Sequence, residues 1–540
     1  MTETTVKELR ERSKDAWQRK IHYEKQLREI YEYGLPFRDP SGIHALTKTQ
    51  EGDQRTDKIF DGTMASAALR FAGRLQRDLA PLFQEFFAIE AGPLVPEGDQ
   101  KKELTEEFQR IGKMANGVLS SGKFHMRFHE IAMDLFAGTG ALNISAGDQA
   151  EPAKFRAAPI TEIALEEDGD GEIDGTDWRK IYKARQLRRR WPDGDFSRRL
   201  KDLMDSNGEA ELTIHQHTFY EASERRWKLK VWEEGQDQQE QFFEETYRTR
   251  PWITPRFFVV PGEPYGRGLA HLGLPSAKTT NKARELALMA AAFAVMGLWA
   301  RRDDGTFNPD TATFEPLAMW QVGSTGGPLG PTLQRLEVPH NFDISSFVIE
   351  DERQQMKMAM MDDALPPMSG SVRSPTEIAE RMAQLSQDLG GVYGRLTLEI
   401  VAPMVQRVID ILEQMGALQT TLTIDQLVTQ VRVVAPIAAG QQAQKVQQTT
   451  SWLEMIGMIF GPQAVNMFAR TEAIVPELAR WLGVEERFIR SQEEITNLQE
   501  ALAQMMAQQQ DQPEGQNGAQ AANGRDPREA ARQVMNRGAS

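Results

Sequence analysis

The chain has 540 residues and no cysteine. The absence of thiols excludes disulfide bonds and metal sites with thiolate ligands, and it suits a reducing compartment such as the cytoplasm. Long apolar runs are missing too, because the longest, residues 286–300, has 15 residues, whereas a membrane-spanning helix needs about 20. The first residues show no basic region followed by an apolar one, so we expect neither a secretory signal nor a membrane protein.

Basic residues are in the minority. There are 63 Lys and Arg side chains against 78 Asp and Glu, which gives a net charge of −15. Tight, static binding along DNA depends on Lys and Arg that neutralise phosphates, so this balance argues against a protein that grips DNA. It is compatible with a protein through which DNA slides, because a wall with few cations would not hold the phosphates.

Motifs of common enzymes are also missing. Gly138-Thr139-Gly140 is too short for a phosphate-binding loop, and no Gly-Lys-Ser or Gly-Lys-Thr occurs anywhere in the chain. The Gly-x-Ser-x-Gly motif of serine hydrolases is absent as well. We therefore expect no ATP hydrolysis, nominate no catalytic residue and no cofactor, and assign any ATP-driven step to a separate protein.

Two patterns resemble metal sites, and each fails at one position. His125 and His129 have the spacing of a zinc pair, but Met126 stands where metalloproteases have Glu, so we favour a packing or surface role. Residues 168–175 resemble a calcium loop, but the twelfth loop position, which needs a bidentate Glu, is Ile181. We predict an acidic hairpin turn there and no metal site.

The apolar pattern predicts an α+β fold that is mainly α. Apolar residues recur at helical spacing in four segments of the first part of the chain. These helices are expected over residues 4–33, 61–79, 100–120 and 123–136. A strand is expected at 141–145, and from about 153 to 260 the period changes to two, most clearly in 212–219 and 227–232. That alternation is typical of antiparallel strands joined by polar turns.

Two further helices are predicted at residues 276–300 and 345–361, on either side of an insert rich in glycine, proline and threonine. A short loop follows and contains Pro366, Pro367 and Gly370, so it cannot continue either neighbouring helix.

A capping box then begins a long helix over residues 374–415, because Ser374 is followed three residues later by Glu377. Gly390-Gly391 and Pro403 interrupt its apolar stripe, so we expect a bent helix. Residues 436–505 are predicted to be helical, and the Gln-, Gly- and Asn-rich residues 506–540 are predicted to be disordered.

Four motifs in this order resemble those of the head-to-tail connector, or portal, proteins of short-tailed (podovirus-type) double-stranded DNA phages. They are Thr56-Asp57-Lys58-Ile59-Phe60-Asp61; Tyr265-Gly266-Arg267-Gly268; Ser374-Pro375-Thr376-Glu377-Ile378 with Asp388-Leu389-Gly390-Gly391-Val392-Tyr393; and the glutamine-rich tail. No single motif is highly specific, but their order and spacing are. The resemblance covers roughly residues 5–510.

The resemblance implies a portal fold with wing, stem, clip and crown regions that assembles as a ring. The implied regions are the wing at 1–275, stem helices at 276–300 and 344–362, the clip at 301–343, the tunnel loop at 363–373, the wing again at 374–435 with its long kinked helix, and the crown at 436–505.

The resemblance also nominates residues that meet DNA. The tunnel loop would contribute Pro366, Pro367, Met368, Ser369, Gly370 and Arg373 to the channel. Arg353 and Lys357 are candidate cations of the channel lumen. Arg301 and Arg302, in the clip, either offset the dipole of the preceding helix or meet phosphate, and both interpretations stay open.

By this resemblance the chain is a non-enzymatic subunit of a ring, expected to be a dodecamer, at one capsid vertex of the virion. Double-stranded DNA would be packaged and ejected through the ring. Implied partners are the terminase large subunit, the major capsid and scaffolding proteins, and tail adaptor proteins, with assembly in the host cytoplasm. The alternatives are a cytoplasmic helical scaffold or structural assembly protein and a nucleic-acid-processing enzyme with a divergent carboxylate site.

The densest basic cluster is Arg185, Arg188, Arg189 and Arg190, which ends at Trp191. It could contact nucleic acid. We favour a solvated helix end or a salt-bridge face between subunits, because acidic side chains outnumber basic ones in this chain.

Overall fold

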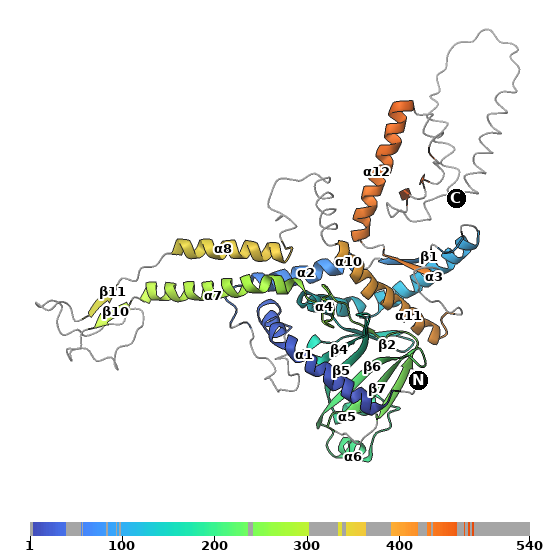
Figure 1. Ribbon diagram of the computed structural model, residues 1–540, viewed down its shortest axis with the longest axis horizontal. Helices are drawn as coiled ribbons and strands as arrows, with labels where there is room; N and C mark the ends of the chain where they lie inside the picture. The colour runs from blue at the N-terminus through green and yellow to red at the C-terminus, as the bar shows by residue number, and fades with distance from the viewer. Residues whose placement is uncertain are drawn as a thin grey trace, which may run out of the picture. The chain divides into compact units, whose positions relative to one another are not determined.

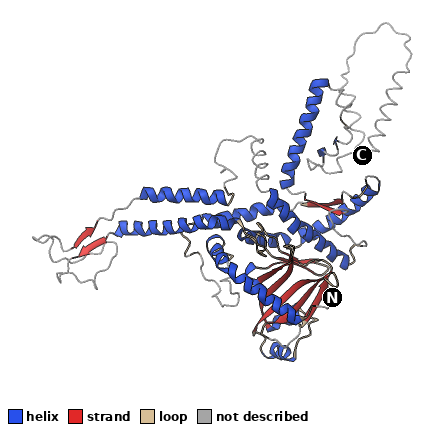
Figure 2. Cartoon of the chain, viewed as in Figure 1, coloured by secondary structure: helices blue, strands red, loops and turns tan. Residues whose placement is uncertain are grey.

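The computed structural model describes most of the chain up to residue 461 and a few residues beyond it. The described residues are 4–38, 56, 58–82, 85–92, 94–96, 99–235, 241–296, 298–301, 333–336, 342–362, 390–418, 429–433, 436–461, 469, 474–475 and 478–479. The chain divides into two compact units, residues 1–442 and 443–540. Helices and strands of the first unit are labelled in Figure 1 and coloured by type in Figure 2.

A five-stranded antiparallel sheet forms one part of the first unit. Its strands are β4 (Ile163–Glu167), β5 (Ile173–Lys183), β6 (Glu211–Glu221), β7 (Arg226–Glu233) and β8 (Phe243–Tyr247), in that spatial order. The alternation in β6 and β7 puts Ile214 on one face and His215 on the other. Helices α5 (Ala184–Arg190) and α6 (Arg198–Ser206) pack on the Ile214 face.

Helix α1 (Val6–Gly34) lies along the opposite face of this sheet (Figure 1). It begins after Thr5, whose hydroxyl accepts a hydrogen bond from the Glu8 amide at 3.3 Å. Trp17 and Ser13 face the sheet and donate hydrogen bonds to Asp177 of β5. A polar interface therefore joins α1 to the sheet.

The largest hydrophobic core gathers helices that are far apart in sequence. They are α2 (Thr63–Leu79), α3 (Asp99–Ser121), α4 (Phe124–Ala137), α10 (Gly390–Leu396) and α11 (Ala402–Gln414). Side chains such as Phe128, Leu135 and Val408 are fully buried there. Burial of a large apolar side chain is worth about 1.5–3 kcal/mol, so this core fixes the position of each of these helices.

Smaller sheets complete the first unit. Strand β2 (Leu142–Ala146) pairs with β3 (Ala153–Ala157) and β9 (Trp252–Ile253), and β1 (Phe87–Ala91) pairs with β12 (Thr429–Val433). A 3₁₀ turn, η1 (Ile160–Glu162), precedes β4. The buried Lys20 of α1 donates hydrogen bonds to the carbonyl oxygens of Ile160, Thr161 and Ile163 at 2.6–2.9 Å, so the helix also anchors this turn.

Two long helices leave this core side by side (Figure 1). They are α7 (Leu269–Met296) and α8 (Phe342–Ala359). Strands β10 (Leu298–Arg301) and β11 (Leu333–Leu336) pair between them in the sequence, with Leu298 opposite Leu336. We call α7 and α8 together the helical hairpin.

Most of the predicted elements are confirmed, including the four N-terminal helices, the antiparallel region and the acidic turn. In that turn, Asp168 accepts hydrogen bonds from the amides of Asp170 and Glu172, both at 2.9 Å, between β4 and β5. Strand β1 and its pairing with β12 were not predicted.

The helix predicted at residues 276–300 has different bounds. It begins at Leu269, so Pro275 lies inside it, and Leu298–Arg301 is a strand instead of its last turn. Pairing with β11 supplies hydrogen bonds that the apolar pattern alone does not reveal.

The long helix predicted at 374–415 is described from residue 390 onward. There α10 continues into a π-helical turn, η3 (Thr397–Val401), and then into α11. The π turn lies just before Pro403, whose missing N–H removes one helical hydrogen bond. The predicted interruption at this proline therefore takes the form of a wider helical turn.

Helix α12 (Pro436–Phe460) agrees with the first part of the helical region predicted at 436–505, and its residues from 443 onward belong to the second unit. The tail 506–540 and most of the insert between residues 301 and 343 lie outside the described residues. Among the described residues, no helix combines the length and the apolar character needed to cross a membrane.

Candidate functional site

The helical hairpin is joined to the core at Asp61, the last residue of the motif at residues 56–61. The Asp61 carboxylate, 3% exposed, accepts hydrogen bonds from Nε and Nη2 of Arg353 at 2.9 and 2.6 Å. Arg284 of α7 donates to the same carboxylate at 3.2 Å, and the Thr63 amide donates at 3.0 Å. One carboxylate thus binds α7, α8 and the start of α2.

Asn281 of α7 adds three hydrogen bonds to the same motif. Its side-chain oxygen accepts from the amides of Phe60 and Asp61 at 2.7 and 3.2 Å, and its side-chain nitrogen donates to the Lys58 carbonyl at 3.0 Å. We call Asp61, Asn281, Arg284 and Arg353 the hairpin junction.

The charges of the junction stabilise one another. Burial acts to raise the pKa of Asp61, but hydrogen bonds from Thr63 and Arg353 hold that pKa below its ordinary value. The hydrogen bond to Asp61 raises the pKa of Arg353. Both groups are therefore charged at any physiological pH.

Arg353 and Lys357 were predicted to face DNA in a channel. The structure shows that Arg353 is held by Asp61 and also lies 3.5 Å from Glu350. Lys357 lies in the last turn of α8, and its carbonyl accepts a hydrogen bond from the Asp362 amide at 2.8 Å. Contact of either side chain with DNA stays a prediction, and Arg353 has a structural partner in addition.

The other predicted site residues are only partly described. Arg301 ends β10 opposite Leu333. Arg302 and the tunnel-loop residues Pro366, Pro367, Met368, Ser369, Gly370 and Arg373 lie outside the described residues. Their roles in the clip and channel stay predictions.

A second charged cluster lies between α1 and the five-stranded sheet, and sequence reasoning did not identify it. Asp177 is completely buried and accepts hydrogen bonds from Ser13, Trp17 and His215 at 2.6, 2.7 and 2.8 Å. His217 is also completely buried, with Nε2 3.5 Å from Glu166. The signal available in the sequence was the pair of histidines two residues apart in a predicted strand.

The two histidines differ in protonation. Burial acts to lower the pKa of His215, but Asp177 outweighs it and raises the pKa to about 9. Burial lowers the pKa of His217. Burial acts to raise the pKa of Asp177, but His215 holds that pKa well below its usual range. His215 and Asp177 therefore form a buried ion pair at neutral pH.

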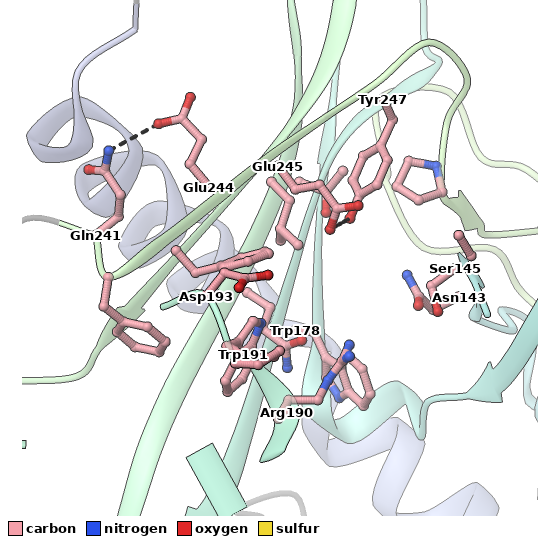
Figure 3. A pocket seen from close by; sticks show the side chains of 18 of the residues that line it. Asn143, Ser145, Trp178, Arg190, Trp191, Asp193, Gln241, Glu244, Glu245 and Tyr247 are labelled. Carbon is pink, nitrogen blue, oxygen red and sulfur yellow. Dashed lines mark hydrogen bonds between the residues drawn. The ribbon is translucent and has the colours of Figure 1, made fainter. Parts of the chain in front are cut away.

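A cavity of about 700 Å³ lies on the other side of the sheet (Figure 3). It is lined by β5, β6, β8, β2 and the loop after α5, with Trp178, Asn143 and Asp193 among its residues. Glu245 accepts a hydrogen bond from Tyr247 at 2.7 Å, and Glu244 accepts one from Gln241 at 3.1 Å. These carboxylates are already engaged by neighbouring side chains.

The arginine cluster before this cavity is partly neutralised within the chain. Arg185 lies 2.6 Å from Glu209, and Arg188 lies 3.0 Å from Asp205. Arg190 lines the cavity, with its guanidinium 5.4 Å from the ring centre of Trp191. These ion pairs favour the interpretation as a solvated helix end.

The two histidines of α4 have packing contacts. His129 is 2.9 Å from the side-chain oxygen of Gln76, and His125 is buried against the rings of Phe86 and Phe124. Among the described residues there is no group of three or more His, Asp or Glu side chains that could hold a metal ion.

Comparison with known proteins gives consistent matches. The chain is 21% identical to the "Probable portal protein" of Bordetella phage BPP-1 over 511 residues, which cover 89% of this chain and 88% of that protein. It is 25% identical to the "Portal protein" of Escherichia phage T7 over 322 residues, covering 58% and 56% of the two chains.

Among solved structures, the chain is similar to one in the virion of a native gene transfer agent particle. The TM-score is 0.36 at 9% identity, covering 74% of this chain and 90% of that one. A chain in the neck of an empty gene transfer agent particle gives a TM-score of 0.36 at 10% identity, with coverage of 72% and 86%.

The family model described as "Bacteriophage head to tail connecting protein" matches residues 6–489, which is nearly the whole chain. This match confirms the resemblance seen in the sequence motifs and the portal, or head-to-tail connector, function predicted from it. The chain belongs to the family of bacteriophage head to tail connecting proteins.

Proposed function

We propose that identical copies of this chain form a ring at one vertex of a phage capsid, through which double-stranded DNA is packaged and later ejected. The observation that carries this proposal is the family match over residues 6–489. The ring is a dodecamer with a central channel, and the subunit itself has no enzymatic activity.

The helical hairpin supports the assembly of several copies. Three large apolar side chains of α7, Leu286, Leu288 and Met289, are 53%, 54% and 48% exposed. Ala287, Ala290 and Ala291 lie among them and are small enough for close approach of another helix. Burial of exposed apolar area stabilises association, so neighbouring copies are the natural partners for this apolar part of α7.

The regions of the proposed subunit follow the sequence order. The wing comprises residues 1–275 and 374–435, and the stem comprises residues 276–300 and 344–362, which include most of α7 and α8. Residues 301–343 form the clip, 363–373 the tunnel loop and 436–505 the crown. In this arrangement the hairpin junction connects wing and stem.

The proposed partners follow from this role. The terminase large subunit supplies the ATP-driven step, and the major capsid and scaffolding proteins surround the ring at its vertex. Tail adaptor proteins attach after packaging. The ring assembles in the host cytoplasm and remains in the virion.

Electron microscopy of the purified protein tests the assembly. Closed rings with a visible central hole are expected in negative stain. Filaments, or single subunits at every concentration tried, would contradict the proposal. Incubation with labelled DNA and Mg²⁺ tests the absence of enzymatic activity, and cleavage of the DNA would count against it.

Deletion of residues 364–371 tests the tunnel loop. We expect the rings to remain intact, because the deletion removes no residue of the described core, and we expect packaged DNA to decrease or to leak from the heads. The measurement is the DNA content of particles assembled in infected cells. A deletion of equal length in the tail, residues 513–520, is the control, and normal packaging by the 364–371 deletion would exclude the proposed role.

A further inference from the structure

Helix α2 contacts both described segments that border residues 363–389. Its residues Arg70, Arg74 and Asp78 are spaced four apart, so they lie along one stripe of the helix. The first two contact the end of α8, and the third contacts α10. Helix α2 itself is held by the core through buried side chains such as Phe71 and Leu75.

The contact near α8 involves Met361 and Asp362, the second and third residues after the helix ends at Ala359. Both Nε and Nη2 of Arg70 donate to the Asp362 carboxylate, the former at 2.8 Å. Arg74 donates to the Met361 carbonyl at 2.7 Å and lies 3.9 Å from Asp362. The Asp362 side chain is only 5% exposed. Two arginines therefore hold a nearly buried carboxylate at the point where α8 ends.

The backbone conformation of Met361 explains why the segment after α8 needs stabilising contacts. Met361 has a φ angle of 54°, in the left-handed region that side chains other than glycine rarely adopt. Such a conformation persists only when surrounding contacts enforce it. The hydrogen bond from Arg74 to the Met361 carbonyl is one such contact, and it fixes the direction in which the chain leaves α8.

The contact with α10 is formed by Asp78 and Tyr393, which are both buried. The Tyr393 hydroxyl donates to Asp78 at 3.1 Å, and Arg77 donates to the other carboxylate oxygen at 2.9 Å. Burial raises the pKa of Tyr393, so its hydroxyl keeps the proton that this hydrogen bond requires. The ion pair with Arg77 keeps Asp78 in place as the acceptor.

These contacts contribute to position more than to stability. The Arg70 side chain is 53% exposed although the Asp362 side chain is only 5% exposed, so solvent partly screens this ion pair. The hairpin junction also holds α8 independently through Arg353. Loss of Arg70 and Arg74 should therefore free the end of α8 without unfolding the subunit.

We propose that α2 is a positioning helix whose stripe of Arg70, Arg74 and Asp78 fixes the direction in which the chain leaves α8 and the position of α10. The functional consequence rests on the proposed function: each copy in the ring would present the end of its stem helix at the same place, and passage of DNA depends on that regularity. The helix holds its neighbours through two polar contacts, which we call the clamps. The first is the ionic contact of Arg70 and Arg74 with Asp362, and the second is the hydrogen bond from the Tyr393 hydroxyl to Asp78.

Hydrogen–deuterium exchange of the full-length protein, followed by mass spectrometry, tests the two clamps separately. The double variant Arg70→Ala/Arg74→Ala should increase amide exchange in residues 358–362 and leave 390–396 unchanged. Tyr393→Phe should increase amide exchange in residues 390–396 and leave 358–362 unchanged. Exchange reports local opening directly, and a general loss of stability would instead raise exchange in both segments and throughout the core.

Arg188→Ala is the matched control, because it removes an Arg–Asp pair on the far face of the sheet, where both side chains are more than half exposed. It should change neither segment. Unchanged exchange at 358–362 in the double variant, or increased exchange in both segments in either clamp variant, would overturn the inference.

The DNA content of assembled particles tests the consequence. The double variant should form rings, but particles assembled with it should contain less DNA than wild-type particles. Particles with Arg188→Ala should contain the normal amount of DNA. Normal packaging by a double variant with increased local exchange would overturn the positioning role. Absence of rings from the wild-type protein would instead overturn the proposed function, and the exchange result would still decide whether the clamps exist.

Discussion

Asp61 and Asp177 are both buried aspartates that join distant parts of the chain, and they differ in the chemistry of their partners. Asp61 is bound by two guanidinium groups, those of Arg353 and Arg284, whose side chains are 26% and 44% exposed. Asp177 is bound by the imidazole of His215 in a fully buried site. Guanidinium stays protonated at all accessible pH values, whereas imidazole loses its proton near neutrality.

The difference indicates two kinds of connection within one subunit. The hairpin junction joins the helical hairpin to the core through two guanidinium groups that reach solvent and keep their charge above neutral pH. The interface between α1 and the sheet depends on a buried charge whose partner can lose its proton. The first should be insensitive to pH and the second should not, and each of the following experiments tests that contrast.

Substitution Asp177→Ala should have the largest effect. It leaves the imidazolium of His215 and the donors of Ser13 and Trp17 buried without their acceptor. Removal of one partner from a buried ion pair costs about 3–5 kcal/mol. The measurement is chemical unfolding followed by tryptophan fluorescence at fixed subunit concentration. Asp205→Ala, which removes a carboxylate that is 64% exposed, is the control and should cost less than about 1 kcal/mol.

The pH dependence of stability should be the next largest effect. Folded protein holds the His215 proton up to pH about 9, whereas unfolded protein releases it near 6.5. The stabilisation is therefore complete below pH 6.5 and is lost as the pH rises through 9. The loss should be on the order of 3 kcal/mol.

Unfolding of wild type and of His215→Gln between pH 6 and 10 tests this contribution, because titrating groups away from His215 behave alike in both proteins. The difference in unfolding free energy should shrink as the pH rises. Asp61→Asn should show a constant difference from wild type over the same interval. A constant difference for His215→Gln would remove the contrast between the two sites.

Local sequence patterns predicted much of the fold, because helices and hairpins are encoded by neighbouring residues. The helix predicted over residues 4–33, for example, agrees with α1 to within two residues at each end. Pairing of Ile89 with Val431 carries no local signal, since the two strands are separated by more than three hundred residues. The same holds for Arg353, whose charge suggested a DNA contact and whose partner Asp61 lies 292 residues away.

The strand β10 shows a second limit of sequence reasoning. Leu298, Trp299 and Ala300 extend an apolar run that favours helix, but their backbone hydrogen bonds go to β11. Which pairing the backbone adopts depends on a segment more than thirty residues further on. The family motifs identified the protein class because their order is informative even where the local structure is not.

The smallest effect is expected at the hairpin junction, when its two arginines are removed one at a time. Arg284→Ala should cost less than about 0.5 kcal/mol, because the side chain is 44% exposed and makes one hydrogen bond at 3.2 Å. Arg353→Ala removes two hydrogen bonds to the carboxylate and should cost about 1–2 kcal/mol. In each single variant the remaining arginine still pairs with Asp61.

The double variant should cost more than the sum of the two single substitutions. Without both arginines the nearly buried Asp61 carboxylate has no cation beside it, and residues that share one partner are coupled. Unfolding of the two single variants and the double variant at one pH gives the coupling energy. Additive costs would show that the two arginines act independently, and the junction would then be a set of separate surface contacts instead of one shared site.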